Sequence, residues 1–466
     1  MLPASNVGLP FSTHHLIHVV ISCAFGFWLI GRISRKDYTN RIELRFWALA
    51  FTIGCYGWVQ TWFPSARVDR ATGVISELDQ EPGLAFGTID QVSSIEVMTT
   101  LTGVLMTFLM AVHFSRRRNT RFAIAVMVTV SGMISALAGL WLQTEGELSA
   151  IWRVHHVPSS VFGLFWYHGN AAAFLNLIWP MGVWLLLSLI KSGQAGMMKQ
   201  MCIALLGAAV LVQMIAVFVN VSKMGHIVLG IECVVLASAL LYQNRAQIRF
   251  LSPVMFARGA ILLLLAASIL GACAWFTGAN SGWSRWRVFS KVGFDDPARR
   301  HAAKMALQIG SDAGWSGTGP GTFEWVSPHY SILDPLLSSG RWRYAHNDYA
   351  QIFAEWGSMG GALIFSLFIL AAGRVINGLW AGSMGSHDSA LSSDRRSGLM
   401  CLSIAVGSVL IHAFVDFPLQ IFAIQFQFAA VSGLAVGMSI PSTQRVSKTH
   451  LAAGKNPEKI WLPRVC

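Results

Sequence analysis

Charged residues are scarce in this chain of 466 residues. Asp, Glu, Lys and Arg together make up 12% of it, 54% of the residues are hydrophobic, and the mean hydropathy is +0.53. Soluble domains carry about a quarter charged residues, so this composition argues against an ordinary soluble protein and favours a membrane protein. Cysteine is scarce too. Nearly all of the 7 cysteines lie inside apolar runs, so no disulfide framework is expected.

Signatures of nucleotide and metal chemistry are also missing. Residues 317–321 are rich in glycine but lack the Gly-Lys-Ser/Thr end of a P-loop, which leaves either a tight turn or a close backbone approach to a ligand. No HExxH motif and no paired CxxC motif occurs, and the adjacent His155 and His156 would point in different directions. We therefore expect neither a metal site nor a cofactor.

Long apolar runs are what the chain has in abundance. A membrane span needs roughly 17–25 mostly apolar residues, and the sequence predicts about eleven such spans, within a range of about 10 to 12. The first run leads into a basic loop rather than a small-residue cleavage site, so it is expected to be a retained span. The predicted fold class is an all-α polytopic membrane protein, with spans centred near residues 24, 53, 104, 132, 179, 210, 233, 268, 367, 408 and 428.

Positive charge is unevenly distributed along the chain. The formal net charge is +12, and the basic residues gather in every second short loop, near residues 32–41, 116–121, 191–199, 245–258 and 374–396, and in the tail. Basic loops stay in the cytoplasm, so this pattern predicts an outside N-terminus and an inside C-terminus. The charge balance is then a topology signal, and no nucleic-acid partner is expected.

This topology divides the chain into four regions. One of them is a long loop, residues 278–350. Loops of this length are uncommon unless they are functional or disordered, and the many aromatic residues of this loop favour short amphipathic helices lying at the membrane surface. One such helix is expected over residues 297–309, with Asp295 or Asp296 as its N-cap. The regions are an N-terminal transmembrane bundle of about eight spans at 1–277, a long periplasmic loop at 278–350, C-terminal transmembrane helices at 351–438 and a basic cytoplasmic tail at 439–466.

The richest polar stretch stands where the ninth predicted span begins. Arg341, Arg343 and His346 come directly before an apolar helix that Asn347 and Asp348 can cap. The N-terminus of that helix carries partial positive charge, so together with the arginines it would form an anion site. Histidine exchanges protons near neutrality, which makes His346 the candidate catalytic base. In the plainer interpretation, the arginines reach lipid headgroups and His346 satisfies a helix end.

Other outward segments bring further candidate residues. Lys223 lies at the turn between the sixth and seventh spans, although lysines at such places also reach for the membrane interface. Glu355 is costly inside a membrane unless it is paired, so it would support the site or hydrogen-bond between helices. Arg299 and Arg300 are expected to face lipid. The candidate substrate-binding residues are Arg341, Arg343, Lys223, Arg285, Arg287, Asn170 and Tyr349, with Glu355, Asp348 and Asp416 in support.

Several cations and a histidine on one outward face favour a lipid that carries a phosphate or pyrophosphate. The planar group of arginine suits such oxygens, and fixed cations would stabilise the charge that develops on a pyrophosphate leaving group. His346 would then deprotonate the attacking hydroxyl. A non-catalytic transporter or flippase of the same lipid would use the cations without needing His346. It should also carry mid-span charge, for which Glu232 and Glu355 are the main cases.

The same residues resemble the O-antigen ligase and polysaccharide polymerase superfamily of bacterial membrane glycosyltransferases. The stretch Arg343-Tyr-Ala-His346-Asn-Asp-Tyr349, followed by Glu355, Gly357 and Gly360, looks like the hallmark of that superfamily. Lys223 stands where relatives usually carry an arginine. Weaker similarities follow in family order at residues 167–174, 222–225, 317–323 and 415–421.

The resemblance implies metal-independent glycosyl transfer in the periplasmic half of the bacterial inner membrane. It implies an undecaprenyl-pyrophosphate-linked glycan as donor, and a glycan, lipid A core or protein hydroxyl as acceptor. It also implies that His346 is the base and that the basic residues hold the pyrophosphate. Ligase, polymerase and protein O-oligosaccharyltransferase remain open within this interpretation, and a transporter of lipid-linked oligosaccharide remains the alternative outside it.

Overall fold

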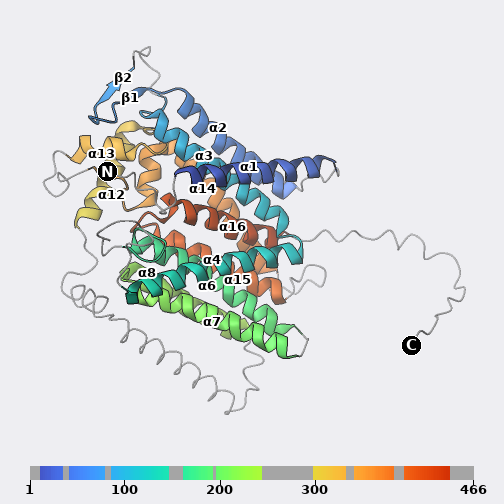
Figure 1. Ribbon diagram of the computed structural model, residues 1–466. Coiled ribbons are helices and arrows are strands. Elements are labelled where there is room, and N and C mark those ends of the chain that lie inside the picture. The colour runs from blue at the N-terminus through green and yellow to red at the C-terminus, as the bar shows by residue number, and fades with distance from the viewer. Residues whose placement is uncertain are drawn as a thin grey trace, which may run out of the picture.

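The computed structural model describes residues 11–34, 41–78, 86–145, 161–192, 196–243, 297–331, 341–381 and 393–440. These residues form twelve α-helices, one short 3₁₀-helix and one two-stranded hairpin (Figure 1). The elements are α1 Phe11–Ser34, α2 Arg41–Trp62, β1 Ala66–Val68, β2 Ile75–Glu77, α3 Gln91–Phe114, α4 Arg118–Glu145, α6 His168–Lys191, α7 Met197–Val219, α8 Lys223–Gln243, α12 Pro297–Ala313, α13 Phe323–Ser331, α14 Asp348–Ala381, α15 Ser393–His412, η1 Pro418–Gln420 and α16 Phe422–Ser439.

The predicted all-α membrane class is confirmed. Eight of the described helices are long and apolar enough to cross a membrane, namely α1, α3, α4, α6, α7, α8, α14 and α16. Ten of the predicted span centres fall inside described helices, and the one near residue 268 lies outside the described residues. Helices α2 and α15 contain two of those centres but open with charged residues. The count of about eleven spans and the four-region division remain predictions.

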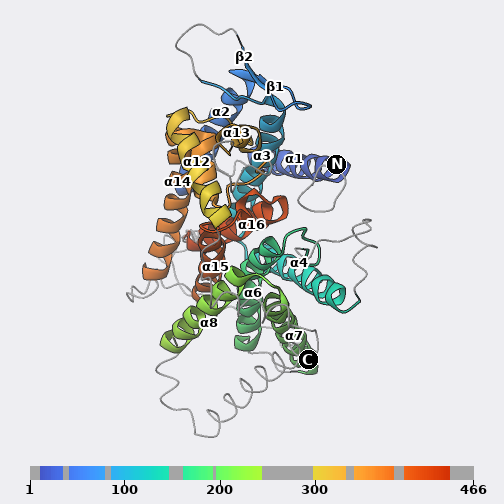
Figure 2. The ribbon, with the colours of Figure 1, turned by 90° about the vertical axis from the view of Figure 1, so that its left-hand side faces the viewer.

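Helix α6 is buried on nearly all of its sides. It packs against α4, α7, α8 and α15, and most of its residues are shielded from solvent and lipid alike. A helix that is hydrophobic all round needs neighbours on every face, and α6 has them. Helix α16 lies in the middle of the molecule and contacts both α3 on one side and α15 on the other (Figure 2). The N-termini of α6 and α16 are therefore brought to the same end of one bundle.

The end of the bundle that contains the start of α14 is covered by α12 and α13. Helix α12 begins at Pro297, as predicted from the sequence, and buries Met305 and Ile309 against α13 and α14. The proposed caps Asp295 and Asp296 lie outside the described residues. Between α2 and α3 the chain forms the antiparallel hairpin β1–β2, with Ala66 opposite Glu77. Hairpin, α12 and α13 lie together over one end of the helices (Figure 1).

Helix α14 is interrupted at Gly357, and a loop fills the break. Gly357 has φ 64° and ψ −170°, which is accessible to glycine and strained for other residues. The backbone N–H groups of Thr318 and Gly319 donate to the carbonyls of Ala354 and Glu355 at 3.0 and 2.8 Å. Gly317 packs so closely on this break that a side chain there would meet the α14 backbone. The glycine-rich motif is therefore a tight turn whose close backbone approach is to α14.

Candidate functional site

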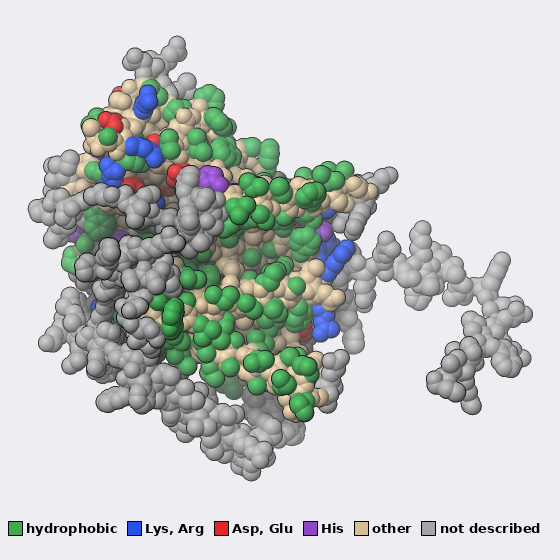
Figure 3. Space-filling view, viewed as in Figure 1, with side chains coloured by type: hydrophobic (Ala, Val, Ile, Leu, Met, Phe, Trp, Pro, Cys, Tyr) green, Lys and Arg blue, Asp and Glu red, His purple; other side chains and the backbone are tan. Residues whose placement is uncertain are grey.

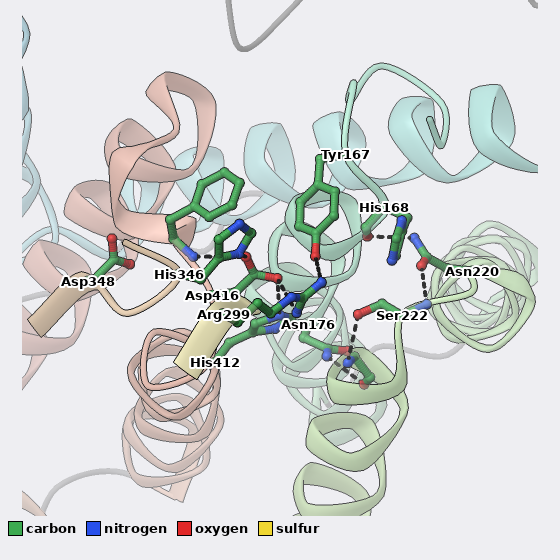
Figure 4. Close-up of polar contacts among 12 residues, drawn as sticks. Tyr167, His168, Asn176, Asn220, Ser222, Arg299, His346, Asp348, His412 and Asp416 are labelled. Carbon is green, nitrogen blue, oxygen red and sulfur yellow. Dashed lines mark hydrogen bonds and ion pairs between the residues drawn. The ribbon is translucent and has the colours of Figure 1, made fainter. Parts of the chain in front are cut away.

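His346 and Asp416 form the centre of the site. The Nδ1 atom of His346 lies 3.2 Å from Oδ1 of Asp416. The histidine side chain is 18% exposed and the aspartate side chain 3%, so the carboxylate is enclosed while the imidazole reaches the surface. His346 has φ 51°, a left-handed conformation that is uncommon outside glycine and marks functional positions when it persists. Figure 4 shows the two side chains pointing toward each other from different segments.

The side chains of Arg299 and His412 also converge on Asp416. Nη1 of Arg299 and Nε2 of His412 each lie 3.9 Å from Oδ2 of the carboxylate. Burial alone would raise the pKa of Asp416, but the hydrogen bond from His346 and the charges of His346, Arg299 and His412 outweigh it and lower that pKa. Asp416 is therefore held as a carboxylate. Its two oxygens have different partners: Oδ1 faces His346, and Oδ2 faces Arg299 and His412.

Tyr167 and Gly169, at the start of α6, complete the surroundings of this carboxylate. Nη2 of Arg299 donates to the Tyr167 hydroxyl at 2.7 Å. A Cβ atom on Gly169 would stand 2.5 Å from Oδ2 of Asp416, so glycine is needed for the carboxylate to fit. Phe417 stacks on Tyr167 with ring centroids 5.4 Å apart, and His346 meets Phe417 edge to face at 4.9 Å. The imidazole is thus oriented by packing as well as by Asp416.

The first turn of α14 is fixed by its own polar side chains. The side chain of Asn347 caps the helix by accepting from the N–H of Ala350 at 3.0 Å, as the sequence predicts. Asp348 is fully buried and accepts from the N–H of Leu419 and the side chain of Gln420. The Tyr349 hydroxyl donates to the carbonyl of Leu410 at 2.7 Å. These contacts tie the start of α14 to the corner that carries Asp416.

Glu355, two turns into α14, is hydrogen-bonded to segments that surround the loop of His346. Its carboxylate accepts from the N–H groups of Gly321 and Phe323 at 2.9 and 3.3 Å and from the side chain of Gln351 at 3.0 Å. The same Gln351 accepts from the N–H of Ala345, the residue before His346, at 3.1 Å. Glu355 therefore links the glycine-rich turn and the start of α13 to the loop that holds the histidine. The supporting role in the site expected from the sequence stays a prediction.

Lys223 is the first residue of α8, and the turn before it is joined to α6. The side chain of Asn220 donates to the carbonyl of His168 at 2.9 Å and accepts from the N–H of Ser222 at 2.8 Å. Gly225 faces Ala172 so closely that a Cβ atom on it would clash. Asn170 is buried one turn into α6, and its side-chain oxygen accepts no hydrogen bond from any residue that the structure describes. Lys223 and Asn170 thus lie on neighbouring helix N-termini.

Arg341 and Arg343 contact α13. The guanidinium of Arg341 lies 4.1 Å from the centre of the Trp325 ring. Nε of Arg343 lies 3.6 Å from Oε2 of Glu324. Both side chains are exposed, so they remain at the surface of the site rather than at the buried carboxylate. Arg285 and Arg287 lie outside the described residues.

Sequence reasoning missed two residues of this cluster. Arg299 was expected to face lipid, and this expectation is wrong because the side chain contacts Asp416 and Tyr167. His412 was not singled out, although it stands four residues before Asp416 and so lies near it at the end of α15. The two adjacent arginines in the first turn of α12 were the available signal for Arg299.

The site combines a positioned base with an anion-binding environment. Helices α6, α8, α12 and α14 all begin here, and each N-terminus carries partial positive charge. Lys223 and Arg299 stand in the first turns of two of these helices. An anionic group close to a transferable proton would be stabilised by this arrangement, which suits displacement of a phosphate-type leaving group.

Comparison with known proteins finds a family match within the chain. Residues 206–365 match the family model described as O-Antigen ligase. The matched segment runs from α7 into α14 and contains Lys223, Arg299 and His346, whereas Asn170 and Asp416 lie outside it. No curated protein matches the chain. The match covers a part of the chain, residues 206–365, and together with the multiple apolar helices it supports an O-antigen ligase family assignment.

Proposed function

We propose that this protein transfers a glycan from an undecaprenyl-pyrophosphate carrier to an acceptor hydroxyl, at the periplasmic face of the bacterial inner membrane. The family match supports membrane glycan transfer in general. The observation that carries the finer proposal is the His346–Asp416 pair, a partly exposed base held by an enclosed carboxylate among helix N-termini. The left-handed backbone of His346, with its ring reaching the surface, supports a functional role at this position.

His346 acts as the general base in this proposal. The hydrogen bond to Asp416 assigns the proton to Nδ1 in the neutral ring, so the lone pair of Nε2 is free to accept a proton. The acceptor O–H gives its proton to Nε2 while its oxygen bonds to the anomeric carbon of the donor sugar. The bond between that carbon and the phosphate oxygen breaks, and its electron pair leaves with the pyrophosphate. Asp416 stabilises the imidazolium that forms.

The pyrophosphate is held by cations and helix N-termini. Lys223 and Arg299 stand on α8 and α12 at the end of the bundle that contains His346. Arg299 is already oriented by Asp416 and Tyr167, so its positive charge would meet an anion without costly rearrangement. Arg341 and Arg343, exposed on the loop before His346, would contact the outer part of the glycan or phosphate.

Reconstitution tests the proposal directly. Purified protein is incubated with a polyprenyl-pyrophosphate-linked oligosaccharide and a saccharide acceptor, without ATP. Transfer predicts glycosylated acceptor and free polyprenyl pyrophosphate in equal amounts. A transporter would only redistribute the donor between leaflets, and that result would overturn the proposal.

The acceptor class is tested in cells that lack this chain. Gel analysis of surface polysaccharide would show lipid A core without attached polymer if the protein is a ligase. A chain-length ladder that collapses to single repeats would indicate a polymerase. An unchanged polysaccharide profile combined with loss of protein glycosylation would favour the protein O-oligosaccharyltransferase alternative.

A further inference from the structure

Trp342 stands beside the proposed base, and neither the family comparison nor the mechanism uses it. Its indole ring is half-buried, with its centre 5.9 Å from the centre of the His346 ring and the two planes at 79°. One side of Trp342 packs on the apolar cluster that α12 and α13 form with Met305 and Phe323. The backbone carbonyl of Trp342 accepts from the Ser327 hydroxyl at 2.9 Å. The ring is therefore held in place while part of it reaches the surface.

The indole N–H of Trp342 is a donor at the surface of the site. Trp28 and Trp184 also lack an acceptor among the described residues, but their indole nitrogens are buried. Trp58, Trp179 and Trp325 each donate this N–H to a side-chain oxygen within about 3 Å, as buried tryptophans usually do. No residue that the structure describes accepts a hydrogen bond from the N–H of Trp342. A fixed, partly exposed ring with an available donor next to a base is the usual make-up of a ligand site.

We propose that Trp342 binds the sugar ring that carries the acceptor hydroxyl. A pyranose has an apolar face of C–H bonds and a rim of hydroxyl groups. Its face would stack on the indole, and one of its hydroxyls would accept from the indole N–H. This inference rests on the proposed function and makes it more specific, because it requires the acceptor to be a saccharide rather than a protein side chain.

The distances favour the acceptor sugar over the donor sugar. The base must reach the hydroxyl that attacks, and a ring stacked on Trp342 has its hydroxyls next to His346. The cations that would hold the donor pyrophosphate lie on α8 and α12, with Arg299 bound to Asp416 and Tyr167. Lys223 and Arg299 are on other segments than Trp342, as two substrates of one transfer need. Arg341 and Arg343 flank Trp342, and their contacts with α13 keep them at the surface, where they would meet outer parts of a glycan.

Steady-state kinetics of three variants test the inference. Transfer is measured from a polyprenyl-pyrophosphate-linked oligosaccharide to delipidated core oligosaccharide, to the free repeat-unit oligosaccharide and to a serine-containing peptide. Trp342→Ala should raise the KM for the saccharide acceptor roughly tenfold, the scale of one lost ring-stacking contact, with a much smaller change in kcat. Trp342→Phe keeps a stacking face and should recover most of the affinity. Trp315→Ala removes a tryptophan that is 55% exposed and stacked on Phe86, and should leave both constants unchanged.

Several outcomes would overturn the inference. A Trp342→Ala variant that loses kcat at unchanged acceptor KM would make Trp342 a support for His346 only. A raised KM for the donor instead of the acceptor would assign the ring to the donor sugar. Efficient transfer by the wild-type protein to the peptide but not to either saccharide would exclude a saccharide acceptor. Absence of any transfer by the wild-type protein would overturn the proposed function together with this inference.

Discussion

The two ends of the helix bundle both gather arginines, yet they use them differently. At the end where α16 finishes, Nη2 of Arg374 donates to the carbonyl of Ser439 at 2.5 Å, and Nε of Arg395 donates to that of Met438 at 2.6 Å. Helix C-termini leave carbonyls without partners, and cations there stabilise the fold by donating hydrogen bonds to those carbonyls. At the end where α16 begins, Arg299 contacts a side-chain carboxylate and a side-chain hydroxyl instead.

The carboxylates show the same contrast. Glu43, at the end that carries the basic loops, is buried between Arg116 at 2.8 Å and Arg32 at 3.6 Å. Its partners are arginines, which hold their charge under all ordinary conditions. Asp416, at the opposite end, is paired with a partly exposed histidine that can gain and lose a proton. Helix α16 has 18 residues and so is about 27 Å long, and these two ends of the bundle are those of this helix. Figure 3 shows basic side chains at both ends of a largely apolar surface.

Replacement of His346 should have the largest effect on activity and should show that this end of the bundle, unlike the other, is catalytic. His346→Asn removes the base while keeping a residue that tolerates the left-handed backbone found there. Glycan transfer should fall by about 10²–10⁴-fold, the usual contribution of a general base, and the melting temperature should stay close to that of the wild type. The exposed His329→Asn on α13 is the control and should keep full transfer. Retained transfer in His346→Asn would remove His346 from the mechanism.

Replacement of Arg299 should have the next largest effect on activity. Arg299→Ala removes a cation from Asp416 and from the proposed pyrophosphate site, so kcat/KM should fall roughly 100-fold, as for the loss of one fixed electrostatic contact. Arg299→Lys should recover only part of this loss, because a point charge does not reach Asp416 and Tyr167 together as the planar group does.

The neighbouring arginine supplies a matched control for this experiment. Arg300→Ala changes an exposed residue on the same turn of α12 and should keep kcat/KM within about threefold of the wild type, as surface substitutions usually do. Equal losses in both variants would show that α12 needs positive charge in general rather than Arg299 in particular.

At the opposite end, replacement of Arg395 should lower stability and spare catalysis. Arg395→Ala removes donors to the carbonyls of Met438 and Ile440, and the free energy of unfolding should fall by about 2 kcal/mol, the scale of hydrogen bonds from a charged group. Thermal melting in detergent measures this loss, and acceptor and donor KM should not change. Arg396→Ala, on the same turn of α15, is the control. A large effect on KM would show that the two ends are coupled.

The sequence predicted the helices because their signal is local. An apolar run long enough to span a membrane predicts a helix without information from distant residues. Ten predicted centres fall in described helices. The start of α14 was also predictable, because Asn347 lies next to the helix that it caps. The start of α12 at Pro297 follows from the same kind of short-range signal.

The contacts that assemble the site were not predictable, because they join segments that are far apart in the chain. Arg299 and Asp416 are brought together by the packing of α12, α14 and α15, and nothing in the amphipathic pattern of α12 says what its polar face will meet. Gly317 and Gly357 indicated tight turns. The sequence could not show that the turn at Gly317 packs into the break of α14 at Gly357, because the two glycines are brought together only in the folded chain. The identity of His346 as a candidate came from motif resemblance, and its partner came from the structure.

The pH dependence of stability should give the smallest effect and still separate the two ends. The pKa of Asp416 is lowered in the folded protein, so its carboxylate stabilises the fold above the ordinary value of about 3.9 and that stabilisation is lost as the pH falls through the folded pKa. The melting temperatures of wild type and Asp416→Asn should therefore differ by a constant amount at pH 5–6 and converge below about pH 4. A difference that grows on acidification would show that Asp416 is protonated in the folded protein, and the division of its oxygens between His346 and Arg299 would have to be abandoned.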